Sequence, residues 1–251
     1  MKHNTSVKTI DRLVAILDSF SPDHPTWSLA KLSQHLDLPK STLHRFLSSL
    51  ETHGVLRRDA DDKRWRLGYR LVTWGALASE STDLRHVAMP IMQELVSATG
   101  ETVVLTVYQG QEVICIEKVE TSHSVRLTLD VGTRRSPHAG ASSKVLMAYL
   151  PEAEIQTIVQ QRGLPQLCSN TITDPGELVA ELERIRAQGY AESLEETDPG
   201  AWGVATPIYE RNGTITAAIG IAGPLSRFDD ERRQQYVDLC CQATQKISAL
   251  V

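Results

Sequence analysis

Residues 28–53 carry the hydrophobic pattern of two short helices joined by a turn. Ser28 suits the N-cap of a helix over residues 29–36, because its hydroxyl can accept a free backbone N–H. A second helix is predicted over residues 40–53, after Pro39, a residue that suits the start of a helix. Its apolar side chains recur at i, i+3, i+4 and i+7 and form one stripe, Leu43, Phe46, Leu47 and Leu50.

The opposite face of the second helix is polar and bears groups that reach phosphates and base edges in a DNA major groove. Its residues are Lys40, Ser41, Thr42, His44, Arg45 and Ser48. Gly54 ends the helix, and strands over residues 55–58 and 64–67 then form a hairpin around an acidic turn. The basic residues of this hairpin are Arg57, Arg58, Lys63, Arg64 and Arg66. Helices followed by such a wing predict a winged helix-turn-helix DNA-binding domain over residues 1–68. Two helices joined by a turn are common in proteins, but the order helix, helix, hairpin is rarer and therefore more specific.

Two further helices flank this pattern. One, over residues 7–19, supplies the third helix of the small domain. The other, over residues 69–79, has Leu71, Trp74 and Leu77 at three-residue steps and is too apolar for a solvated linker. We interpret residues 69–81 as a connecting helix that packs against its counterpart in a dimer. The alternative is that it packs only on its own domain.

From residue 100 onwards the pattern changes to a period of two, interspersed with helical segments. Strands are predicted over residues 102–108, 112–119, 125–130, 203–209 and 215–223. Helices are predicted over residues 84–99, 142–150, 152–161, 175–188 and 229–250. Pro90 is expected to kink the first of these helices. Residues 82–251 therefore form a second domain of the α+β class, and the whole chain is a mixed α/β protein.

Charge differs in sign between the two predicted domains. Residues 1–80 contain 12 Lys and Arg against 9 Asp and Glu, a net charge of +3, whereas the whole chain carries −5. This difference in charge is expected if only the first domain faces phosphates. Because a net charge of +3 is modest, one copy should bind DNA weakly, and we expect two copies on the DNA. The sequence lacks a long apolar run and a signal-peptide core, which favours a cytoplasmic protein.

The common signatures of catalysis and metal binding are missing from the sequence. It contains no G-x-S-x-G elbow, P-loop or G-x-G-x-x-G motif. Its four cysteines have no C-x-x-C spacing, and its eight histidines form no H-x-x-H pair. We therefore expect no catalytic residues, no metal and no cofactor. Cys240 and Cys241, adjacent in the last helix, are interpreted as packing residues.

Several separated segments occur in an order typical of one family. They are STLHRFLSSLETHG at residues 41–54, HAGASSKVLMAYL at 138–150, GYAESLEETDPGAWGVATPI at 189–208 and IGIAGPLSRF at 219–228. In these segments the chain resembles the isocitrate-lyase-regulator (IclR) family of bacterial transcription factors almost from end to end. The resemblance implies a homodimer or homotetramer, a winged helix on operator DNA, and a GAF-like C-terminal domain that binds a small organic effector. Two-fold pairing implies a palindromic operator, and effector binding would shift the DNA-binding domains and alter operator affinity.

Gly140, Ala141 and Ser142 open a predicted helix, and the free N–H groups at such an end favour an anion, here a carboxylate effector. Further pocket positions implied by the resemblance are Leu127, as an apolar wall, and Ser193, Gly203, Gly220 and Ala222. At the last four, small-acid binders of the family often have acidic, Cys or Ser side chains. The smaller residues here predict a larger, drier pocket that suits an aromatic or bulkier acid. The alternatives are a capped helix that binds nothing and a domain that only oligomerises.

Charged residues near these segments have two interpretations. Arg134, Arg135 and His138 are candidates for a countercharge to the effector, although an exposed loop is the commoner place for such residues. Glu195 and Glu196 are similar to an acidic segment of the family, and we interpret them as structural.

Overall fold

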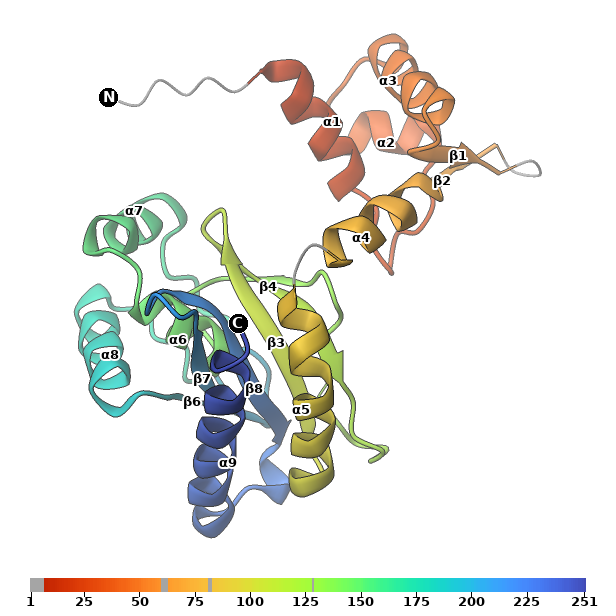
Figure 1. The fold of residues 1–251 in the computed structure, drawn as a ribbon. Helices are drawn as coiled ribbons and strands as arrows, with labels where there is room; N and C mark the ends of the chain where they lie inside the picture. The colour runs from red at the N-terminus through yellow and green to blue at the C-terminus, as the bar shows by residue number, and fades with distance from the viewer. Residues whose placement is uncertain (1–6, 60–62, 81–82, 128) are drawn as a thin grey trace. The chain divides into compact units, whose positions relative to one another are not determined.

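The chain folds into two compact units, Met1–Ser81 and Thr82–Val251 (Figure 1). The computed structural model describes residues 7–59, 63–80, 83–127 and 129–251. Among the helices in these ranges, none combines the length and the hydrophobicity that crossing a membrane requires.

The N-terminal unit is the predicted winged helix-turn-helix. Its elements are α1 (Lys8–Asp18), α2 (Leu29–His35), α3 (Lys40–Thr52), β1 (Leu56–Arg58), β2 (Trp65–Leu67) and α4 (Arg70–Glu80). Ser28 caps α2 as predicted, because its Oγ accepts the Lys31 N–H at 3.3 Å. A buried cluster joins the helices to the wing and includes Leu32, Leu43, Leu47 and Trp65. Packing of α3 on this cluster leaves its polar face free.

The C-terminal unit is built on one antiparallel sheet. Its strands are β3 (Thr102–Gln109), β4 (Glu112–Val119), β5 (Arg134–Arg135), β6 (Ala191–Leu194), β7 (Ala201–Tyr209) and β8 (Ile215–Pro224). They lie in the order β5-β4-β3-β8-β7-β6. The two hairpins, β3–β4 and β7–β8, are therefore joined in the middle of the sheet by β3 and β8.

Helices cover both faces of this sheet (Figure 1). They are α5 (Asp83–Thr99), α6 (Ala141–Ala148), α7 (Glu152–Arg162), α8 (Pro175–Gln188) and α9 (Asp230–Ser248), with a 3-10 turn at Leu225–Arg227. One hydrophobic cluster packs α5 and α9 on the first face, and another packs α6, α7 and α8 on the second. Pro90 lies inside α5 without ending it. The domain is α+β, as predicted.

Cys240 packs between α9 and the sheet. Its thiol is fully buried and lies 3.6 Å from the carbonyl oxygen of Ile219. Burial raises the pKa of Cys240 to about 12 and that of half-buried Cys241 above its usual value. The interpretation of Cys240 as a packing residue is confirmed.

One strand prediction was wrong, and two short strands, β5 and β6, were not predicted. Residues 125–127, 129 and 130 are not in a strand, and residue 128 lies outside the described residues. The reason is that β4 gives its outer edge to a later segment: Cys115 exchanges hydrogen bonds with residues 132 and 133, and β5 pairs beyond them. The prediction also missed β6, a four-residue edge strand whose inward positions are Ala191 and Ser193 while Leu194 is exposed.

Candidate DNA-binding surface and ligand cavity

The polar face of α3 is exposed opposite its buried stripe. Leu43, Leu47 and Leu50 are buried, whereas Phe46 is only partly so. Of the predicted contact residues, Lys40, Ser41, His44 and Arg45 are exposed, and Thr42 and Ser48 are half-buried. The Ser48 Oγ lies 3.4 Å from the His44 Nδ1, which links two neighbouring side chains on this face. The arrangement is that of a helix able to enter a major groove.

The basic side chains of the wing are held in place by contacts within the domain. Arg66 forms an ion pair with Asp59 at 2.7 Å, and the Arg58 guanidinium lies 5.0 Å from the centre of the Trp65 ring. Further hydrogen bonds from Arg57 Nε to Leu67 O and from Arg58 Nε to Lys63 O measure 3.4 and 3.3 Å. Arg64 and Lys63 are exposed at the turn. The sequence indicated only that basic residues gather in the wing, and these contacts show how their side chains are held.

The C-terminal unit contains a cavity of about 270 Å³ between the sheet and the start of α6. Its floor is one row of residues across four strands, in which Thr102 pairs with Ala222, Ala222 with Gly203, and Gly203 with Ser193. The two middle residues have almost no side chain, and the two end residues carry hydroxyl groups. The cavity is therefore deepest over the centre of this floor, and the floor is polar at its ends.

The roof of the cavity is the N-terminus of α6. Gly140 is the N-cap, with a φ of 88° that favours glycine. Gly140, Ala141, Ser142 and Ser143 all line the cavity. Among the hydrogen bonds of the described residues, none uses the N–H of Ala141, Ser142 or Ser143. Three N–H donors at a positive helix end can therefore bind an anion.

An unpaired hydroxyl lies on the floor of the same cavity. Thr102 is 1% exposed, and its Oγ1 has no hydrogen-bond partner within the described part of the chain. Buried hydroxyls in proteins nearly always have a partner, so this orphan is consistent with a ligand that supplies one. Apolar side chains complete the wall: Val104, Leu127 and Leu129. The cavity thus combines donors at one end with an apolar body.

The structure gathers the predicted pocket residues, with one exception. Leu127, Gly140, Ala141, Ser142, Ser193, Gly203 and Ala222 all line the cavity. The expectation that Gly220 opens pocket volume was wrong, because a side-chain carbon there would come within 2.5 Å of the Ser142 Oγ. The missing side chain of Gly220 makes room for Ser142, not for a ligand.

The candidate countercharges separate into different environments. Arg135 lines the cavity and lies 3.5 Å from Asp198, whereas Arg134 forms an ion pair with Glu112 at 2.8 Å. His138 is buried outside the lining, and burial lowers its pKa. Arg126, which sequence reasoning missed, also lines the cavity and lies 3.4 Å from Glu120. Its position one residue before Leu127 was the signal that could have indicated it.

Comparison with known families explains this pairing of a winged helix with a ligand cavity. The family description "Bacterial transcriptional regulator IclR C-terminal" matches residues 76–249, and "IclR helix-turn-helix domain" matches residues 9–60. The chain belongs to the IclR family. It is accordingly an IclR-type transcriptional regulator with a DNA-binding helix-turn-helix domain.

Relatives of this IclR regulator are similar over nearly their whole length. The transcriptional regulator KipR of Bacillus subtilis is 33% identical, with 96% of this chain and 97% of KipR covered. The transcriptional repressor AllR of Escherichia coli is 32% identical, with coverages of 96% and 89%. These proteins are described as transcriptional regulators, not as enzymes.

Solved structures of IclR proteins share the fold. The Thermotoga maritima IclR structure has a TM-score of 0.74 at 30% identity and covers 96% of this chain and 97% of its own. An IclR homologue of Microbacterium hydrocarbonoxydans, complexed with 4-hydroxybenzoate, has a TM-score of 0.84 at 27% identity, with the same coverages.

Proposed function

We propose that this IclR regulator binds a palindromic operator as a homodimer or homotetramer and changes its affinity when an aromatic or bulky organic acid fills the cavity. The effector carboxylate accepts hydrogen bonds from the N–H groups of Ala141, Ser142 and Ser143. Its apolar body lies over Gly203 and Ala222. Operator binding requires a cytoplasmic location.

The observation that carries this proposal is the pairing of free N–H donors with a floor of very small residues. A helix N-terminus attracts an anion by about 0.3–1 kcal/mol, and more where water is excluded. Gly203 and Ala222 leave space where longer side chains would occupy the floor. The 4-hydroxybenzoate complex of a similar protein supports an aromatic acid as the class to test first.

Pairing of two copies is supported by apolar side chains that face solvent in the N-terminal unit. Those on α1 or at its N-cap are Val7, Ile10 and Val14, and those on α4 are Val72, Trp74 and Leu77. On α1 the apolar side chains recur at steps of three and four residues, and on α4 Trp74 and Leu77 lie three residues apart on one face, so each helix presents an apolar surface. A second copy of the chain, two-fold related, would bury these surfaces and place two recognition helices on a palindrome.

A thermal-shift screen of the full chain tests the effector class. The panel consists of benzoate, 4-hydroxybenzoate, short aliphatic acids and the matching carboxamides. We expect a saturable rise in Tm of roughly 5 °C with an aromatic acid at 100 times its Kd, because binding to the folded state stabilises it by about 2.7 kcal/mol. The same acid should change operator affinity in a fluorescence anisotropy titration.

The Ala222→Val variant is the control for the site. Its added methyl groups enter the cavity, so the shift with aromatic acids should disappear while the Tm without ligand stays close to that of the wild type. If no acid shifts the wild-type Tm, the carboxylate effector class fails, which favours either a constitutive DNA-binding protein whose C-terminal domain serves only oligomerisation or a neutral ligand outside the panel.

A further inference from the structure

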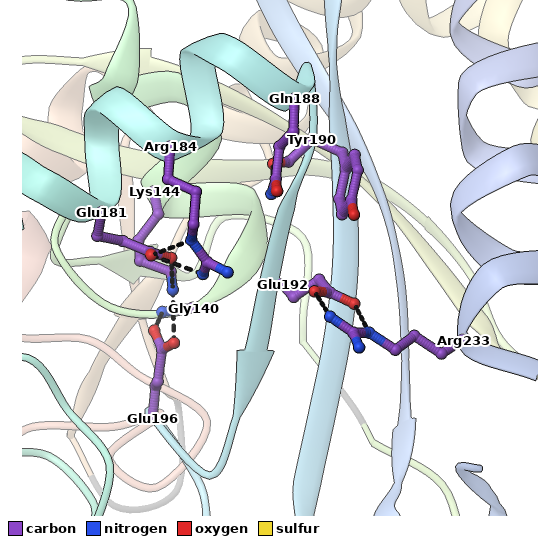
Figure 2. A network of polar contacts seen from close by, with 9 residues as sticks. All are labelled: Gly140, Lys144, Glu181, Arg184, Gln188, Tyr190, Glu192, Glu196 and Arg233. Carbon is purple, nitrogen blue, oxygen red and sulfur yellow. Dashed lines mark hydrogen bonds and ion pairs between the residues drawn. The ribbon is translucent and has the colours of Figure 1, made fainter. Parts of the chain in front are cut away.

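A buried lysine lies one turn into α6, close to the cavity but outside its lining. Lys144 is 1% exposed, and its Nζ lies 2.8 Å from Glu181 Oε1 and 2.5 Å from Glu196 Oε1 (Figure 2). Neither Lys144 nor Glu196 lines the cavity. An ammonium group buried to this degree persists only when charged partners surround it, so its position is tightly determined.

Glu196 links this lysine to the start of the helix. Its second oxygen, Oε2, accepts the N–H of Gly140 at 2.9 Å (Figure 2). Its backbone carbonyl accepts the hydroxyl of Thr171 at 2.6 Å. The carboxylate of Glu196 therefore fastens the segment that contains it to the N-cap of α6, and the ammonium of Lys144 binds the other oxygen of that carboxylate.

That segment is a tight turn over residues 195–200, and it forms one wall of the cavity. Glu195 has a left-handed φ of 50°, which a non-glycine residue keeps only where its surroundings fix it. Here the Glu195 N–H donates to Ala201 O, and the Gly200 N–H to Glu195 Oε1, both at 2.7 Å. Thr197 and Asp198, at the tip of the turn, line the cavity. Glu196 thus positions a wall that it does not itself form.

The negative charge of Glu196 also affects how strongly a carboxylate effector binds. The Glu196 carboxylate occupies the same positive helix end at which the effector carboxylate would bind, so the two anions repel each other. The ammonium of Lys144, paired with Glu196, offsets that negative charge. Burial raises the pKa of Glu181, but hydrogen bonds from Lys144 and Arg184 outweigh it and keep the pKa of that carboxyl below its usual value.

We propose that Lys144 and Glu196 form a latch that fixes the turn over residues 195–200 against α6 and sets the affinity for a carboxylate effector. Both are positioning residues, because they act through Gly140 and the turn and touch no ligand. The part of this inference that concerns affinity rests on the proposed function. The part that concerns the turn does not.

Hydrogen exchange of the full chain without ligand tests the latch alone. The Glu196→Gln variant should exchange roughly tenfold faster in peptides that cover residues 139–146 and 195–201, because local opening becomes easier. The matched control is Glu192→Gln, which breaks the ion pair between Glu192 of β6 and Arg233 of α9 (Figure 2). This control should leave those peptides unchanged. Equal exchange in Glu196→Gln and the wild type would overturn the latch.

Calorimetric titration with 4-hydroxybenzoate and 4-hydroxybenzamide tests the charge effect. In Lys144→Met, the ratio of carboxylate to carboxamide affinity should fall about tenfold, because Glu196 then repels the ligand without compensation. Adding Glu196→Gln to this variant should restore the ratio. A purely structural role would lower both affinities alike and would overturn the inference.

Two further results separate a failure of the latch proposal from a failure of the proposed function. If Lys144→Met does not fold, Glu196→Gln alone decides the charge effect, since removing the like charge should raise the ratio above that of the wild type. If the wild type binds neither ligand, the proposed effector class fails, and hydrogen exchange still decides whether the latch exists.

Discussion

His138 lies beside the start of α6 with its ring fully buried. Its Nδ1 is 2.7 Å from the Ser136 Oγ, and its Nε2 is 3.1 Å from the carbonyl oxygen of Pro165. A carbonyl can only accept, so the ring proton is on Nε2, and Nδ1 accepts the Ser136 hydroxyl. Burial lowers the pKa of His138 below its ordinary value of 6.5. The folded protein therefore holds a neutral imidazole.

This environment predicts a pH dependence of stability. Because the folded-state pKa is lowered, the unfolded chain binds the proton more readily, and stability should be lost as pH falls below about 6.5. In His138→Gln, urea unfolding between pH 5 and 6.5 should show a shallower loss of the unfolding free energy than in the wild type. The exposed His86→Gln is the matched control, and an identical slope in His138→Gln would contradict the prediction.

At the scale of elements, α3 and the wing present cations in different ways. Arg45 is exposed on α3, whereas Lys63 is exposed at the turn of the wing. A side chain on a helix in the major groove reads base edges, and a cation on the wing contacts phosphates. The two elements should therefore divide specificity and affinity between them.

Operator titrations of two variants test this division. Arg45→Ala should weaken binding to the operator by about 1–3 kcal/mol and relax its sequence preference. Lys63→Ala should weaken binding to the operator and to random DNA alike and reduce the salt dependence by about one unit of slope. Equal losses on both DNAs in both variants would contradict the assignment. Fluorescence anisotropy at several salt concentrations makes the measurement.

The elements also show why some strands were predicted and others were not. The hairpins β3–β4 and β7–β8 alternate regularly around turn residues, so local sequence suffices to indicate them. β6 inverts the usual pattern, because Ser193 faces the cavity and Leu194 faces outward. Residues 125–130 have strand-like composition, but β4 pairs its outer edge with residues 132–135. Strand pairing depends on which edge is available, and that is a tertiary property.

At the scale of the whole molecule, the exposed apolar face of α4 predicts an oligomer. Leu77, on the face that Trp74 shares, is 59% exposed, so Leu77→Asp should leave the folding of one copy almost unchanged. It should weaken association by about 2 kcal/mol if this face is the centre of the interface. Sedimentation velocity over a range of concentrations, with the exposed Val131→Asp as control, makes the test. An unchanged association constant would mean that α4 packs elsewhere.

The sequence by itself determined the winged helix, the domain class and the family resemblance. Each rests on information that is local in the chain: helical periodicity around Leu43 and Leu47, the glycine after α3, and contiguous motifs such as residues 138–150. It also indicated seven residues of the cavity lining, six of which lie in contiguous motifs.

Only the tertiary structure decided what those residues do for one another. The cavity floor joins Thr102, Ala222, Gly203 and Ser193 through strand register, although the first and the second are 120 positions apart. The same is true of Lys144 and Glu196, whose contact spans 52 residues. Packing and register bring distant groups within hydrogen-bond distance, and no local pattern in the chain encodes that proximity.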